Sequence, residues 1–396
     1  MLSKRLAATL AGASALGVVG VSGCSLILGL KSNSADMDAG VEGVDSGRRP
    51  HDAAVRDTSH HEAAAHDVGP SHDAACCTCT GGTELGARCL VTLVADAGFP
   101  VAILVDEGSV YWANFGNPTT FTLGSIMKAG SAPDDGRPVT TLAPGQPRPF
   151  RIAIENGDMY WIDRGNPDAS LLAPPRIARV SLEGAGYAVL TTSVSNPFGI
   201  GLNDAGVYWT NNGPVSADIE RVALDGGIAT TLVAGPSDTA WAMAADGTGN
   251  IYWTINNGTD GSVWVLWADG HTTSLAAGQD GAWALTVGNG HVYWATRGTD
   301  GGASPTVMSV TPEAGVISVL ATPSGGFPYS ITVDTANLYW TDVARNLVMR
   351  VGLDGGIATT LATRPDASGP SSIAVDDASV YWTEVYGGKI MKLTPK

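Results

Sequence analysis

The hydrophobic positions of this chain recur in a pattern that repeats seven times between residue 100 and the last residue, Lys396. Each repeat starts with a run in which small and large apolar residues alternate, as in "SITVD" and "SIAVD". A Gly- and Asn-rich stretch such as "ENGD" or "GNGH" follows, and then an apolar residue and a Tyr-Trp dipeptide. Alternation with a period of two predicts a strand, and a short Gly/Asn-rich stretch predicts a hairpin turn. The Tyr-Trp strand should therefore return antiparallel to the first.

Two more apolar segments follow each dipeptide, which predicts four strands per repeat. The third strand reads "SIMK", "IARV" or a variant, and the fourth reads "TTLA" or a variant. Successive dipeptides stand 41 to 49 residues apart, and "LDGGIATTL" occurs verbatim at 224–232 and 353–361, which indicates an array of similar units. The dipeptides are Tyr111-Trp112, Tyr160-Trp161, Tyr208-Trp209, Tyr252-Trp253, Tyr293-Trp294, Tyr339-Trp340 and Tyr381-Trp382. The fourth strands carry Leu142, Leu190, Leu232, Leu275, Leu320 and Leu361.

The two ends of the array complement each other. The seventh repeat ends after its third strand, but "CLVTLVADAGFP" ahead of the first repeat places Leu93 seven residues before Pro100, as Leu142 stands seven before Pro149. An N-terminal strand that completes the last unit would close a ring. We predict an all-β fold over residues 86–396, a seven-bladed β-propeller of four-stranded antiparallel blades. A linear solenoid is the alternative, but its terminal units should be polar and atypical.

The Tyr-Trp strand and the "LDGG" that follows some repeats resemble the YWTD propellers of the low-density-lipoprotein receptor family. "LYWTD" at 338–342 is a full match, and "VYWTN", "VYWTE" and "IYWTI" are near matches. The resemblance covers about three quarters of the chain and implies a propeller that binds partners, although that family has six blades. Inter-blade hydrogen bonding from the last motif position, which the resemblance implies, is not expected at Ile255. The repeats more distantly resemble the seven-bladed propellers of the virginiamycin B lyase type, which implies an enzyme as an alternative.

The first strand of each repeat indicates a channel and one of its mouths. A column of mostly small residues should face the channel, and Arg151 is its only charged member. The preceding column is aromatic in five repeats, and we predict a ligand-binding channel mouth from Phe150, Arg151, Phe198, Trp241, Trp283 and Tyr329. The aromatic rings could instead cap the core between blades, since they share the period of the large packing positions. Arg151 could bind a carboxylate or phosphate, or pair with Glu155.

Catalytic chemistry has little support in the repeats. His271 and His291 are the only imidazoles there, and neither has an evident nucleophile partner, so no catalytic residue, metal ligand or cofactor is predicted. An acidic column at the first hairpin could ring a channel cation, but its place favours turn capping. It comprises Asp106, Glu155, Asp246, Asp334 and Asp376. A metal-dependent lyase or hydrolase acting in the channel remains the alternative function.

The N-terminus predicts export and a lipid anchor. Residues 1–23 have a basic start, a short apolar run and small residues, which is typical of a signal peptide, and "VSGC" resembles the bacterial lipobox. Cys24 would then be lipidated, and Ser25 after it favours the outer membrane. A plain secretory signal or a membrane anchor are the alternatives, but the run is short for a spanning helix.

Residues 24–75 and 76–89 differ from the repeats. The first range is rich in Ala, Asp and His, which predicts a disordered tether; it holds five histidines whose spacing does not fit a zinc-protease motif. Loose metal binding there stays open. Outside the cytoplasm, the clustered cysteines favour two disulfides with open connectivity over a zinc site. They are Cys76, Cys77, Cys79 and Cys89.

Charge narrows the partners. The chain carries 22 Lys and Arg against 38 Asp and Glu, a net charge of −16, so no nucleic-acid surface is expected. We predict a cell-envelope lipoprotein that reaches the membrane through its N-terminal lipid. Its propeller would act as a scaffold that binds an unknown protein or small ligand.

Overall fold

The computed structural model describes residues 79, 81–117, 122–132, 138–165, 173–212, 217–235, 239–256, 261–279, 281–298, 304–364 and 368–396. Contacts divide the chain into two units, residues 1–71 and 72–396. The predicted signal peptide, Cys24, the tether with its histidines, Cys76 and Cys77 lie outside the described residues.

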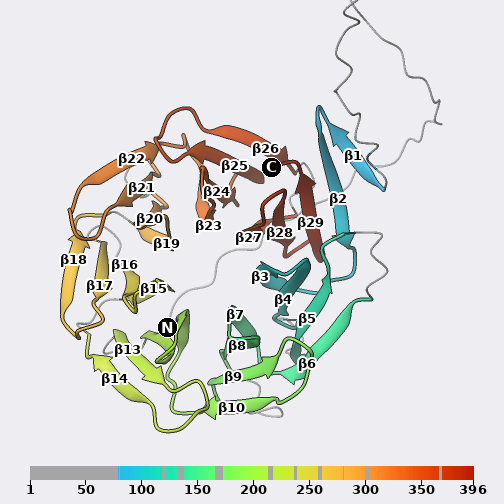
Figure 1. Ribbon diagram of the computed structural model, residues 1–396. Helices are drawn as coiled ribbons and strands as arrows, with labels where there is room; N and C mark the ends of the chain where they lie inside the picture. The colour runs from blue at the N-terminus through green and yellow to red at the C-terminus, as the bar shows by residue number, and fades with distance from the viewer. Residues whose placement is uncertain are drawn as a thin grey trace, which may run out of the picture. The chain divides into compact units, whose positions relative to one another are not determined.

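Seven antiparallel sheets stand around a common centre (Figure 1), which confirms the predicted seven-bladed propeller. The inner strands of blades 1 to 7 are β3 (Pro100–Asp106), β7 (Pro149–Glu155), β11 (Pro197–Asn203), β15 (Thr239–Ala245), β19 (Ala282–Gly288), β23 (Pro328–Val333) and β27 (Pro370–Val375). The Tyr-Trp strands are β4 (Ser109–Asn114), β8 (Asp158–Asp163), β12 (Gly206–Asn212), β16 (Ile251–Asn256), β20 (His291–Thr296), β24 (Asn337–Asp342) and β28 (Val380–Glu384). The third strands are β5 (Gly124–Gly130), β9 (Arg176–Ser181), β13 (Ala217–Val222), β17 (Ser262–Leu266), β21 (Val307–Val310), β25 (Leu347–Gly352) and β29 (Lys389–Thr394). The outer strands of blades 1 to 6 are β6 (Thr140–Gln146), β10 (Ala188–Thr191), β14 (Thr230–Val233), β18 (Thr272–Ala276), β22 (Ile317–Ala321) and β26 (Thr359–Thr363), and β2 (Arg88–Val94) serves blade 7.

The secondary structure of the described residues is entirely strand, turn and loop. Within these ranges there is no helix long and apolar enough to cross a membrane.

The Tyr-Trp dipeptide builds the interface between neighbouring blades. Because successive side chains of a strand point to opposite faces, Tyr and Trp serve different interfaces. Trp161 of blade 2 shares a buried cluster with Tyr111 of blade 1, and the same pairing recurs at all seven interfaces. The seven Trp side chains are 0–3% exposed. Burial of each Trp side chain stabilises the folded propeller by about 4 to 6 kcal/mol, as an upper estimate.

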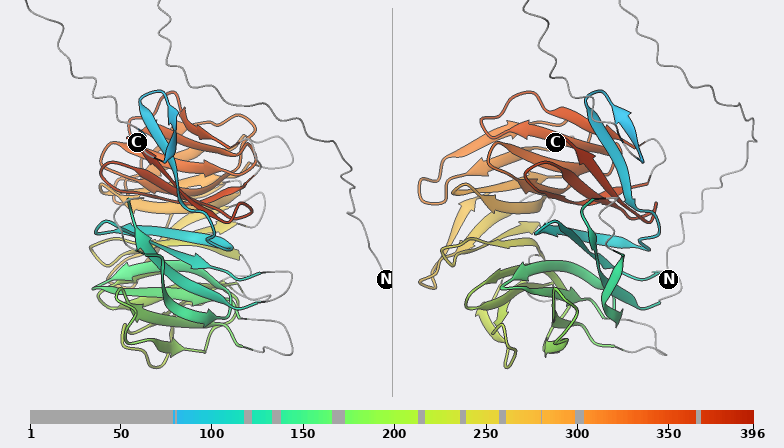
Figure 2. Two further views of the ribbon diagram at one scale, coloured as in Figure 1. Left: turned by 90° about the vertical axis from the view of Figure 1, so that its right-hand side faces the viewer. Right: turned by 45° about the vertical axis from the view of Figure 1, so that its right-hand side comes forward.

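The N-terminal strand closes the ring as predicted. β2 pairs antiparallel with β29, with Leu90 opposite Leu393, and both views in Figure 2 show β2 beside the C-terminal strands. Trp112 of blade 1 packs in one cluster with Tyr381 of blade 7, so this last interface is built like the other six.

A bulge marks the equivalent position in every outer strand. The pairing between third and outer strands skips the outer-strand leucine in each blade, and in blade 1 it also skips Gly145. Leu93 is the residue skipped in blade 7, which confirms that the N-terminal strand takes the place of a missing outer strand.

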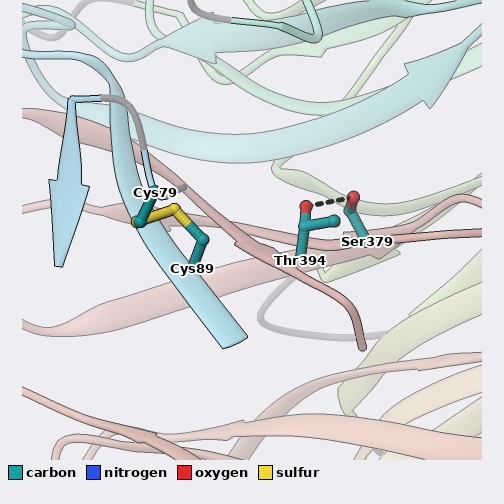
Figure 3. Close-up of a disulfide and its surroundings, with 4 residues drawn as sticks. All are labelled: Cys79, Cys89, Ser379 and Thr394. Atoms are coloured by element: carbon teal, nitrogen blue, oxygen red, sulfur yellow. Dashed lines mark hydrogen bonds between the residues drawn. A yellow bond between two sulfur atoms is a disulfide. The ribbon is translucent and has the colours of Figure 1, made fainter. Parts of the chain in front are cut away.

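A fifth strand, which the repeat pattern does not predict, extends the last blade. β1 (Gly82–Leu85) pairs with β2 and begins four residues ahead of the expected boundary at 86. A disulfide joins Cys79 to Cys89 with their Cα atoms 5.3 Å apart (Figure 3), so these two cysteines form one of the expected bonds. Cys89 faces Thr394 in register, and the Thr394 hydroxyl lies 2.6 Å from that of Ser379.

Three members of the acidic column cap hairpin turns, as the sequence favoured, whereas among the described residues no such bond is found for Asp106 or Glu155. The Asp334 carboxylate accepts hydrogen bonds from the Ala336 and Asn337 amides and from the Tyr339 hydroxyl. Partial burial alone would raise the pKa of Asp334, but these bonds and one from Lys396 outweigh it and lower that pKa to about 2. Asp246 and Asp376 bind their own turns and the Tyr of the next strand in the same way.

Leu393→Ala should destabilise the ring at its closure. Leu393 is fully buried opposite Leu90, so its truncation should lower the free energy of unfolding by about 2 to 5 kcal/mol in urea titrations. Ile357→Ala is the control, because Ile357 is 93% exposed, and it should change stability by less than about 0.5 kcal/mol. Equal losses from the two variants would contradict this account of closure.

Candidate ligand site at one mouth of the channel

A bulge in every inner strand places the predicted mouth column. In blade 2, Pro149 pairs with Asp163 and Arg151 with Ile162, so Phe150 between them is left unpaired. The other inner strands also skip one or two residues at this place. A bulge redirects the extra side chain, so the period-two argument for a packing face does not hold at this column.

Threonines of the Tyr-Trp strands support the wider bulges. The Thr210 hydroxyl accepts a hydrogen bond from the Gly199 amide at 2.8 Å, and Thr383 accepts one from the Ser372 amide at 3.0 Å. Both threonines are fully buried. The third residue of the "YWT" motif therefore satisfies backbone amides that the bulge removes from the ladder.

The bulged residues form a continuous arc of aromatic rings. Ring centroids lie 5.1 Å apart for Phe150 and Phe198, 4.5 Å for Phe198 and Trp241, 4.3 Å for Trp241 and Trp283, and 5.8 Å for Trp283 and Tyr329. The structure thus brings together all five aromatic residues predicted at the mouth. They come from the consecutive blades 2 to 6.

Two rings extend this arc that the sequence did not single out. Phe115 lies 6.3 Å from Phe150, and Phe327 lies 5.5 Å from Trp283. Phe115 follows its "YWAN" strand directly and Phe327 directly precedes Pro328, so both sit at the mouth end of their blades. Their positions next to these strand ends could have identified both rings as mouth residues from the sequence.

One end of the arc, Trp283 and Tyr329, borders the channel cavity. A cavity of about 230 Å³ is lined by Arg151, Trp283 and Tyr329 together with small inner-strand residues such as Gly199 and Ser330. Phe150 is 9% exposed, while the other four predicted rings are half-buried, in contrast to the buried Trp residues of the interfaces. Trp283 also packs on the buried cluster of blades 5 and 6, so the packing alternative holds in part. The ligand-binding role of these rings stays a prediction.

Arginines lie on the aromatic faces around the mouth. The guanidinium carbon of Arg151 is 4.6 Å from the centroid of Phe150, and no ion pair joins Arg151 to Glu155. Three further arginines that the sequence analysis missed lie against other rings. They are Arg148 over Phe115 at 4.5 Å, Arg164 over Phe198 at 4.7 Å, and Arg297 over Trp283 at 5.5 Å.

Burial and mutual repulsion act on the arginines of blade 2. Burial lowers the pKa of Arg164, and the positive charges of Arg148 and Arg151 lower it further. Burial also lowers the pKa of Arg148. Arg164 is therefore close enough to Arg148 and Arg151 to be repelled by both, which favours an anion beside them.

The candidate acid and base residues lie elsewhere. His271 is exposed in the turn between β17 and β18 beside Asp269, and His291 lies near Thr311 at the start of β20. Over the described ranges, no group of three or more His, Cys, Asp or Glu residues could hold a metal ion. In those ranges the channel cavity is lined by no His, Cys, Asp or Glu side chain.

These features define a seven-bladed β-propeller with an aromatic, arginine-bearing channel mouth. No protein-family model and no curated protein sequence matches the chain. It is similar in fold to a streptogramin B lyase structure, with a TM-score of 0.62, 18% identity, and 78% of this chain and 98% of that chain covered. It is similarly related to virginiamycin B lyase from Staphylococcus aureus, with a TM-score of 0.62, 16% identity and the same coverage. A nidogen/laminin complex gives a TM-score of 0.50 at 19% identity over 67% of this chain and 98% of that one. At these identities the likeness shows the fold alone.

Alanine substitutions should separate mouth residues from interface residues. Trp340 is fully buried, so Trp340→Ala should lower the free energy of unfolding by about 3 to 5 kcal/mol. Trp241→Ala should cost less than half as much, because its ring is half-buried at the mouth. Urea titration of both variants measures the difference. Similar losses would show that Trp241 serves mainly to pack the blades.

Proposed function

We propose that this protein is a lipid-anchored cell-envelope protein whose propeller binds a ligand at the aromatic mouth of its channel. The observation that carries the proposal is the arc of rings from five consecutive blades, of which four are half-buried and two, Trp283 and Tyr329, line a cavity of about 230 Å³. Aromatic side chains that remain partly exposed and converge on a concave site are typical of binding surfaces.

The polar atoms of the mouth support binding. The Trp241 indole nitrogen and the Arg148 Nε are buried, and neither has a hydrogen-bond partner among the described residues. Buried polar groups are normally satisfied, so unpaired donors at the mouth favour a ligand that supplies acceptors.

The lyase or hydrolase alternative has weaker support. Two structures of similar fold are lyases, but the likeness extends to the fold only. Acid–base or metal-assisted chemistry needs carboxylates or imidazoles near the reacting atoms, and Arg151 is the only ionisable side chain, apart from Tyr329, in the described channel lining. We therefore favour binding.

The anchor is proposed from the N-terminal sequence. A basic start, an apolar run and "VSGC" at 21–24 support cleavage before Cys24 and lipid attachment there. Ser25 supports the outer membrane as the destination. One lipid chain gives only marginal membrane binding, so stable anchoring would need further acylation.

A triple variant tests the binding site. Arg151→Ala, Trp241→Ala, Trp283→Ala should lose the ligand or partner that the wild type retains from a cell-envelope extract, identified by mass spectrometry. The matched control is the variant Arg221→Ala, Trp264→Ala, Trp267→Ala. It removes the same residue types from the third strands β13 and β17 and from the turn that follows β17. Retention of the same partners by the mouth variant would refute the proposed site.

The lipid anchor has its own test. Cys24→Ser should move the protein from the detergent phase to the aqueous phase in a phase-partition assay, because the lipidated thiol is lost. Ser25→Ala keeps the cysteine and should stay in the detergent phase. A Cys24→Ser variant that still partitions with detergent would rule out this anchor.

A further inference from the structure

Three arginines of blade 2 lie on neighbouring rings, Arg148 on Phe115 and the other two on Phe150, and the Arg164 amide donates to the Arg148 carbonyl oxygen at 3.1 Å. Arg148 precedes β7, Arg151 lies on β7, and Arg164 follows β8. Phe150 carries two of them, with the guanidinium carbon of Arg151 at 4.6 Å and that of Arg164 at 5.1 Å from its centroid. Stacked in this way, a guanidinium group keeps its N–H edge available for an oxygen acceptor.

No carboxylate of the described residues forms an ion pair with these three side chains. Arg164 donates to the neutral Asn196 amide oxygen at 3.0 Å, and the buried Arg148 Nε has no acceptor. Other arginines near the same ends of the blades are paired, such as Arg176 with Asp163 at 2.7 Å and Arg345 with Asp342 at 2.8 Å. Arg297 at the mouth has no ion pair with a described carboxylate either, but it stands alone on its rings, whereas blade 2 gathers three such arginines in a chain with 38 acidic residues.

The backbone conformation of Arg148 is also energetically unfavourable. Its φ is 67°, in the left-handed region that disfavours long side chains. The residues that precede the inner strands of blades 3, 5 and 7 have the same conformation, but they are Asn196, Gly281 and Gly369. Strain held at a polar site is often linked to function, and here it is held together with uncompensated charge.

We propose that Arg148, Arg151 and Arg164 form an oxyanion subsite of the mouth, and that the ligand is a small molecule with a carboxylate or phosphate beside a planar apolar body. The inference rests on the proposed function and specifies its ligand class. The oxyanion accepts charge-assisted hydrogen bonds from the guanidinium edges. The planar body stacks along Phe198, Trp241 and Trp283, which continue the arc away from the arginines.

The net charge of the chain does not help to attract an anion to this site. A net charge of −16 repels anions at long range, so attraction must come from the arginine cluster itself. At an ionic strength of about 0.15 M, charges are screened beyond about 8 Å. Oxyanion binding should therefore depend on these three side chains and not on the overall charge.

Calorimetric titration of the mature full-length protein tests the subsite. The probes are naphthoate, naphthyl phosphate and the neutral naphthalenemethanol, which share one planar body. At least one anion should bind about tenfold or more tightly than the neutral probe, because each charge-assisted hydrogen bond contributes at that level. A preference for naphthoate identifies a carboxylate ligand, and one for naphthyl phosphate identifies a phosphate.

Variants locate the effect. Arg148→Gly, Arg151→Gln and Arg164→Gln should each remove most of the anion preference. Arg148→Gly should also fold normally, since Gly281 and Gly369 fill the equivalent place in blades 5 and 7. Arg350→Gln is the control, because Arg350 lies on β25 opposite Tyr339, away from the mouth, and it should keep the preference.

A second measurement excludes a purely structural role. Inorganic phosphate alone should raise the thermal midpoint of the wild type and not that of Arg148→Gly. If the arginines only pack against the rings, phosphate will shift both proteins equally or neither.

The outcomes separate this inference from the proposed function. Equal affinity for all three probes, no binding of any probe, or an anion preference that survives the three variants would overturn the oxyanion subsite. Loss of envelope partners in the triple mouth variant would still support the binding function. Retained partners in that variant, with an anion preference abolished by Arg148→Gly, would instead support the subsite and refute the wider mouth.

Discussion

The packing of each Trp against the Tyr of the preceding blade is the contact on which the rest of the structure depends. One dipeptide serves two interfaces because its side chains point to opposite faces of a strand. Seven such contacts form a closed series, and the last joins Trp112 to the cluster of Tyr381. The channel, its mouth and the rings around it exist only because this series closes, which it does through the pairing of β2 with β29.

The two ends of the inner hairpins are built differently. At the turn end, Asp246, Asp334 and Asp376 are saturated by their own backbone amides and by Tyr hydroxyls, so these acids are committed to the fold. At the other end, bulges interrupt the ladder and redirect aromatic side chains, which gather in the arc at the mouth. The first end stabilises the blades, and the second leaves side chains and charges available for binding.

Much of this architecture could be predicted from the sequence, because the same pattern of strands occurs in seven repeats and can be compared between them. The Tyr-Trp strands, the closing role of Leu93 and the aromatic composition of the mouth follow from columns of equivalent residues. The orientation of Phe150 and its counterparts could not follow from a period of two, since a bulge changes the period at that residue. Arg148 and Arg164 lie outside the strands, in connections whose path the repeat pattern does not predict, so only the fold places them near Arg151. β1 belongs to no repeat and had no comparable signal.

The Cys79–Cys89 bond determines how tension would enter the ring. Residues ahead of Cys79 are joined covalently to Cys89, at the start of β2, as well as through the β1 hairpin. A force applied to the residues ahead of Cys79 is therefore transmitted through the disulfide to β2. It does not unzip β1 from β2. The mechanical strength of the propeller under such a pull is then set by the hydrogen bonds between β2 and β29, the first and last strands of its ring.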